Sequence, residues 1–157
     1  MGIYLNPDNN RYERLCNSPI FVDKSLLIEY TNKAINTSND CICVTRPRRF
    51  GKSTDANMLV AYYSKGTNSK DLFNTLNINH CPSFLEHLNK HNVIHLNIQD
   101  FLSTTNSIDE MLSKINRMIL KDLKFEFKDV ITETEIIDAF NEVYAYTKNK
   151  FIFIIDE

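Results

Sequence analysis

The sequence lacks any long apolar segment. Residues 1–14 are mostly polar or charged, so they do not form the basic start and apolar stretch of a secretory leader. No other stretch reaches the roughly 20 consecutive apolar residues with which a helix spans a membrane. Internal repeats and low-complexity segments are also lacking. These absences argue against a secreted or membrane-spanning protein, and we expect a cytoplasmic protein.

The chain also lacks a strong excess of either charge. Its 18 Lys and Arg residues and 20 Asp and Glu residues give a formal net charge of -2. The whole-chain charge therefore gives no argument for binding to nucleic acid or to a membrane. Basic residues do cluster locally, which suits a polyphosphate, although a solvated basic turn or a contact with DNA or RNA would also explain them. The cluster consists of Arg46, Arg48, Arg49 and Lys52.

Cysteine is scarce and shows no ligand pattern. The 4 cysteines lack the paired two-residue spacing of zinc sites, so we expect them to be reduced and buried. The 4 histidines all lie between residues 80 and 95, but their spacing matches no known set of metal ligands. We therefore predict no zinc site. The cysteines are Cys16, Cys41, Cys43 and Cys81.

One basic turn carries the strongest chemical signal. A phosphate-binding loop reads glycine, four residues, glycine, lysine, then serine or threonine. Here Gly51, Lys52 and Ser53 are present, and Arg46 stands at the first glycine. Such a loop binds anions because backbone N–H groups and a helix N-terminus face the ligand. Lys52 would add a positive charge, and the Ser53 hydroxyl can ligate Mg²⁺.

The residues on either side of the turn fit this interpretation. Cys41–Val44 favours a strand, and the residues from Ser53 onward show helical spacing, so the turn would join a strand to a helix as the motif requires. Arg46 would either narrow the pocket with its Cβ or offer its guanidinium to phosphate oxygens. The predicted nucleotide-binding residues are Arg46, Pro47, Arg48, Arg49, Phe50, Gly51, Lys52, Ser53 and Thr54.

A second signal lies at residues 151–157. The continuous apolar run Phe151–Ile155 is typical of a central parallel strand that is buried on both faces. Asp156 follows this run, at the position of a carboxylate that organises Mg²⁺. Glu157 comes next, from where it could orient and deprotonate an attacking water. The alternative interpretation is a core strand that simply runs into a polar turn.

The rest of the chain alternates predicted helices with predicted strands. Asp23 is a candidate helix cap, and three capping boxes would begin further helices at Ser83, Ser107 and Thr132. Residues 93–98 form a predicted strand. Strands separated by long helical crossovers imply an α/β fold with a parallel sheet that helices cover on both sides, which makes three layers.

Three segments together resemble the AAA-ATPase-like family of P-loop NTPase-like proteins. They are Phe21–Ser25, Thr45–Ser53 and Phe151–Glu157, and they occur in the family's order. Arginine in place of the first glycine is part of that family's pattern. The resemblance implies ATP and Mg²⁺ as cofactors, with Ser53 and Asp156 as metal ligands and Glu157 as the catalytic residue.

The resemblance also implies roles for two residues of the first segment and further domains after the third segment. Asp23 and Lys24 could contact nucleotide or another domain, although a helix cap with a solvated lysine would explain them equally well. In the family, more of the ATPase-like domain and often a PD-(D/E)XK nuclease-like domain follow the Asp-Glu pair. We therefore expect residues 1–157 to be the N-terminal part of such a domain, with an incomplete sheet and no hydrolysis in isolation. The alternative function is a non-catalytic binding or regulatory module attached to a nuclease-like domain.

Overall fold

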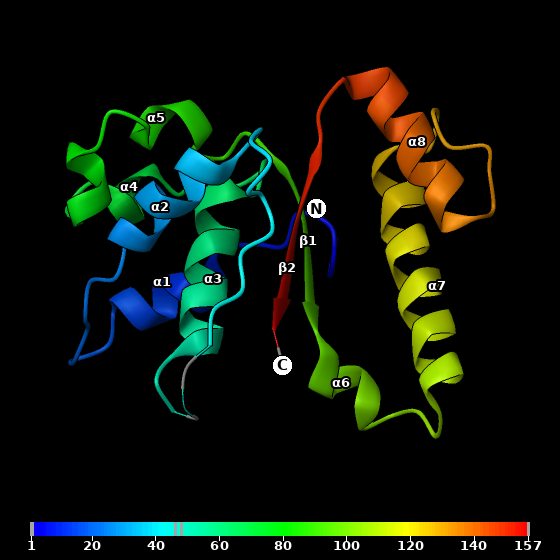
Figure 1. Ribbon diagram of the computed structural model, residues 1–157, viewed down its shortest axis with the longest axis horizontal. Helices are drawn as coiled ribbons and strands as arrows, with labels where there is room; N and C mark the ends of the chain where they lie inside the picture. The colour runs from blue at the N-terminus through cyan, green and yellow to red at the C-terminus, as the bar shows by residue number, and fades with distance from the viewer. Residues whose placement is uncertain (1, 46, 48, 157) are drawn as a thin grey trace. The chain divides into compact units, whose positions relative to one another are not determined.

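The computed structural model describes residues 2–45, 47 and 49–156 (Figure 1). The chain divides into two compact units. We call Met1–Pro7 with His91–Glu157 the sheet unit, and Asp8–Lys90 the helical unit. No helix within the described ranges is long and apolar enough to cross a membrane.

The sheet unit is built on two parallel strands. β1 (Asn92–Asn97) pairs with β2 (Phe151–Asp156), and Asn97 lies opposite Asp156 in the register. Parallel pairing requires a long crossover, which the helices between the strands provide (Figure 1). On the other edge of β1, Leu5 forms an antiparallel bridge with Ile94. The crossover helices are α6 (Ile98–Leu102), α7 (Ile108–Glu126) and α8 (Ile136–Thr147).

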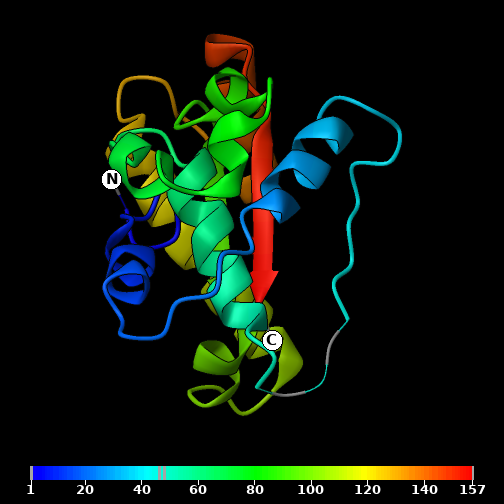
Figure 2. The ribbon, with the colours of Figure 1, turned by 90° about the vertical axis from the view of Figure 1, so that its left-hand side faces the viewer.

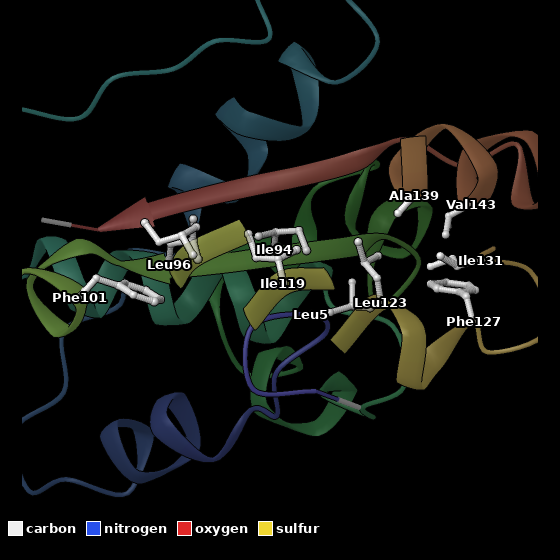
Figure 3. Close-up of a cluster of buried hydrophobic side chains, with 11 residues drawn as sticks. Leu5, Ile94, Leu96, Phe101, Ile119, Leu123, Phe127, Ile131, Ala139 and Val143 are labelled. Carbon is white, nitrogen blue, oxygen red and sulfur yellow. The ribbon is translucent and has the colours of Figure 1, made fainter. Parts of the chain in front are cut away.

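The core of the sheet unit lies between β1 and the crossover helices. Figure 3 shows apolar side chains from β1, α6, α7 and α8 gathered around Leu5. The predicted cap at the start of α7 is confirmed, because the Ser107 hydroxyl accepts a hydrogen bond from the Glu110 N–H at 3.1 Å. From this start, Ile115, Ile119 and Leu123 recur at helical spacing and are buried.

The core of the helical unit contains aromatic rings that pack against one another. Tyr12 stacks on Phe73 with 5.2 Å between ring centroids, and Tyr62 meets the same Phe73 edge-on at 5.5 Å. All three rings are buried. The helices of this unit are α1 (Asn10–Cys16), α2 (Leu26–Ala34), α3 (Lys52–Tyr63), α4 (Lys70–Phe73), η1 (Asn77–His80) and α5 (Phe84–His87).

The predicted strand at Cys41–Val44 is wrong. These residues form no strand and are exposed, and in Figure 2 they belong to an extended trace that leads toward α3. A strand needs hydrogen bonds to a neighbouring strand, and no described backbone group makes one to this segment. The expected burial of Cys41 and Cys43 is wrong for the same reason, since both are exposed.

The predicted burial of β2 on both faces is also wrong. Within the described residues β2 pairs only with β1, and the side chains of Phe153 and Ile155 are 52% and 64% exposed. Ile154, which points to the opposite face, is buried. The α/β class is therefore confirmed by a two-stranded parallel sheet with helical crossovers, whereas the three-layer arrangement stays a prediction.

Two of the predicted capping boxes do not form. The Ser83 hydroxyl accepts a hydrogen bond from the Asn32 amide at 3.0 Å and caps no helix. The Thr132 hydroxyl donates to the Glu142 carboxylate at 2.6 Å, and α8 begins only at Ile136. In both places a partner outside the four-residue capping box takes the hydroxyl that the local pattern assigned to the helix start.

Candidate functional site

The turn before α3 has the backbone of a helix entrance. Gly51 occupies the N-cap position with φ 83° and ψ 29°, a left-handed conformation that favours glycine. Its carbonyl accepts the first hydrogen bond of α3, from the Asp55 N–H at 2.9 Å. Lys52 and Ser53 are the first two helical residues. Because the first N–H groups of a helix have no acceptor within it, this turn presents backbone donors next to a lysine and a serine.

The residues predicted to bind nucleotide divide into two groups along the turn. Pro47, Arg49 and Phe50 precede the helix and are exposed, and the Phe50 N–H donates to the Pro47 carbonyl at 3.4 Å. Ser53 is exposed as well, so its hydroxyl is open to a ligand, whereas Thr54 is half-buried. The predicted residues Arg46 and Arg48 lie outside the described residues, as does Glu157.

Lys24 joins this turn from a distant part of the chain. Its ammonium donates a hydrogen bond to the Phe50 carbonyl at 3.1 Å. It also forms an ion pair with Asp55, with 3.2 Å between Nζ and Oδ1. A Cβ added at Gly51 would lie 2.7 Å from this Nζ atom. Of the two roles left open for Lys24, the solvated lysine is therefore wrong, because the side chain is engaged on both sides of Gly51.

The residues on either side of Lys24 fix its backbone. Asp23 accepts hydrogen bonds from the N–H groups of Ser25 at 2.7 Å and Asn77 at 2.8 Å. Burial by itself raises the pKa of Asp23, but these hydrogen bonds outweigh it and hold the pKa below its ordinary value. The buried Ser25 hydroxyl accepts from the Ile78 N–H at 3.1 Å. Residues 23–25 therefore anchor α2 to η1 while Lys24 extends to the turn.

Asp55 is an unusual residue to find below this turn. It lies in the first turn of α3 and is only 4% exposed. Neither carboxylate oxygen has a hydrogen-bond partner within the described chain, so the ion pair with Lys24 is the contact that balances its charge. A buried carboxylate without such a partner would be costly. No local pattern in the sequence predicts this pair, although Lys24 lies in the segment Phe21–Ser25 that resembles the family.

Asp156 lies in the sheet unit, at the end of β2 and opposite Asn97. It is half-buried. Ser53 belongs to the helical unit. Both side chains offer oxygen atoms, the ligands that Mg²⁺ prefers when phosphates and water complete its shell. No group of three or more His, Cys, Asp and Glu side chains in the described part of the chain could hold a metal ion by itself.

Comparison with known proteins gives one family. The model of the AAA-ATPase-like family, which is described as a predicted AAA-ATPase, matches residues 10–157. No curated protein and no solved structure matches the chain. The matched range includes both the turn at Gly51 and the strand that ends at Asp156.

Proposed function

Since this chain belongs to the AAA-ATPase-like family, we propose that it binds ATP with Mg²⁺ through residues 46–54. The observation that carries the proposal is the left-handed Gly51 at the entrance to α3, followed at once by Lys52 and Ser53. This arrangement puts helix N–H groups, an ammonium and a hydroxyl at one turn, which is the donor set that a polyphosphate needs.

Each residue would have a distinct task with nucleotide. The N–H groups of the first turn of α3 would bind phosphate oxygens, and the Lys52 ammonium would pair with the β- and γ-phosphates. The Ser53 hydroxyl and the Asp156 carboxylate would hold Mg²⁺, whose chemical contribution is to neutralise charge on those phosphates. Glu157 would orient and deprotonate the water that attacks the γ-phosphate. Hydrolysis is thus part of the proposal for the complete ATPase-like domain, and a nuclease-like domain after it stays a prediction.

Removal of the Lys52 ammonium tests nucleotide binding. A fluorescent ATP analogue is titrated into the full chain with Mg²⁺ and with EDTA, for wild type and Lys52→Ala. Loss of one charge-assisted contact of about 2–3 kcal/mol predicts about 30–150-fold weaker binding. Lys70→Ala is the control, because Lys70 is an exposed lysine in α4 of the same unit, and it should bind as wild type does.

Two results separate the possible functions. Equal affinity in wild type and Lys52→Ala would refute the phosphate-binding role of the turn. In the complete domain, Glu157→Gln should retain ATP binding and lose phosphate release. Saturable, Mg²⁺-dependent binding without phosphate release in the wild-type complete domain would instead identify the non-catalytic module. Binding to DNA or RNA with a steep salt dependence, and without need of Lys52, would identify the nucleic-acid role.

A further inference from the structure

Lys24 and Asp55 form an ion pair beneath the candidate phosphate turn. Asp55 brings a negative charge into the first turn of α3, the same turn whose N–H groups would receive phosphate. A polyphosphate and an unbalanced carboxylate at one helix entrance would repel each other. Burial makes this repulsion stronger, because the 5% exposed side chain of Asp55 is little screened by water or salt.

Lys24 is placed to remove this repulsion. Its ammonium is 3.2 Å from the Asp55 carboxylate, so the pair carries no net charge. The same ammonium holds the Phe50 carbonyl at 3.1 Å and so ties the residue before Gly51 to the helix that follows it. An ammonium has three donors, so Lys24 can contact Asp55 and the Phe50 carbonyl at once. Its side chain is 30% exposed.

The position of Lys24 is enforced from both sides. Asp23 and Ser25 bind backbone N–H groups of the segment at Asn77 and Ile78, so the backbone that carries Lys24 is anchored. Gly51 contributes by lacking a side chain, since a Cβ there would crowd the ammonium at 2.7 Å. Gly51 is therefore needed for its left-handed backbone, and a side chain there would require the Lys24 ammonium to shift.

We propose that Lys24 is a positioning residue of the phosphate turn, which neutralises Asp55 and holds the Phe50 carbonyl so that the turn accepts a polyphosphate. This inference rests on the proposed ATP binding. Lys24 acts through Asp55 and the backbone of the turn, and it differs in this from Lys52, which would pair directly with the phosphates.

A second substitution that restores a neutral pair tests the proposal. Titrations of the fluorescent ATP analogue with Mg²⁺ compare the full-length wild type with Lys24→Met, Asp55→Asn and the double variant. Lys24→Met leaves the carboxylate unbalanced and should weaken binding about tenfold, or 1.4 kcal/mol. Asp55→Asn leaves the positive charge of Lys24 unopposed at the turn and should tighten binding about threefold. The double variant restores neutrality, so its affinity should return to within about threefold of wild type.

The matched control is Lys33→Met. Lys33 also forms an ion pair, with Glu29 at 2.7 Å, on the surface of α2 in the same unit. Loss of that pair should leave ATP affinity unchanged. Circular dichroism of each variant reports folding, and tighter binding by Asp55→Asn is a result that a purely structural role of the ion pair does not produce.

The outcomes distinguish this inference from the proposed function. Weaker binding by Lys52→Ala together with unchanged binding by Lys24→Met overturns the role of Lys24 alone. A double variant as weak as Lys24→Met also overturns it, as does an Asp55→Asn variant that binds more weakly than wild type. If wild type binds no nucleotide, or Lys52→Ala binds as well as wild type, both proposals fail together.

Discussion

Asn32 lies at the centre of a buried polar network in the helical unit, which makes it a sensitive test of the packing described here. It is 5% exposed. Its amide donates to the Tyr62 hydroxyl at 3.1 Å and to the Ser83 hydroxyl at 3.0 Å, and its carbonyl accepts from the Tyr63 hydroxyl at 2.7 Å. The Tyr62 hydroxyl in turn donates to the Phe84 carbonyl at 2.6 Å. Each polar atom of the Asn32 side chain is therefore paired.

The substitution Asn32→Asp keeps the shape of the side chain and changes one donor into an acceptor. The new oxygen would face the Tyr62 hydroxyl oxygen, whose proton is directed to the Phe84 carbonyl. Burial raises the pKa of Tyr62 to about 12, which shows how poorly this site supports negative charge. A lost hydrogen bond at a buried site costs about 1–3 kcal/mol, and a buried carboxylate costs more. We expect the free energy of unfolding to fall by about 3 kcal/mol at pH 7.

The sign of the pH dependence provides a second check. Burial should raise the pKa of the introduced carboxyl above its value of about 3.9 in the unfolded chain. The penalty is then largest at neutral pH and shrinks as the pH falls through the raised pKa, because the protonated acid can donate again. Asn32→Leu removes the same hydrogen bonds without a titrating group, so its cost should not change between about pH 7 and pH 5.

Urea unfolding of the full chain measures these differences. Far-UV circular dichroism is the suitable probe, because the chain has no tryptophan and most described elements are helices. Asn79→Asp is the control, since Asn79 is exposed in the same unit, and its cost should stay below about 0.5 kcal/mol. If Asn32→Asp costs no more than this control, the network is not the stabilising feature that we describe.

Two further predictions concern single side chains. Ser107→Ala should lower the free energy of unfolding by about 1 kcal/mol, because the Glu110 N–H loses its cap; urea unfolding checks this, and an unchanged midpoint would contradict it. Asp23 has a lowered pKa, so its hydrogen bonds to Ser25 and Asn77 contribute stability that is present above the unfolded pKa of about 3.9 and is lost as the pH falls through the lower folded value. Asp23→Asn should therefore lose less stability than wild type on acidification to about pH 2, and parallel pH profiles would refute this.

The elements that depend on caps and apolar spacing within a short stretch of sequence were predicted correctly. Ser107 and the apolar spacing after it indicated α7, and the helix begins there. The strand pattern at 93–98 and the apolar run at 151–155 indicated the two strands, and their long separation indicated parallel pairing, as β1 and β2 show. Cys41–Val44 failed because β-favouring residues only permit an extended chain, whereas pairing depends on a neighbour that local sequence does not reveal.

The same distinction applies to the candidate site. Gly51 and Lys52 indicated a turn that enters a helix, and α3 begins at Lys52. The pairing of Lys24 with Asp55 could not be derived by pattern, because Lys24 precedes α2, Asp55 lies in α3, and the two meet only through the tertiary fold. The predicted Ser83 cap was wrong for a similar reason, because the Ser83 hydroxyl accepts a hydrogen bond from the Asn32 amide, which is far away in the sequence.

The division of the chain into units has a consequence for the order of folding during synthesis. The sheet unit is discontinuous in sequence, and the whole helical unit is made between Leu5 and its partner Ile94. The ribosome adds about 5–20 residues per second, so the N-terminal residues spend several seconds outside it before β1 follows. During that time residues 4–6 have no strand to pair with, while the contacts of the helical unit can already form. Residues 4–6 are therefore accessible, during these seconds, to a chaperone that binds extended apolar segments.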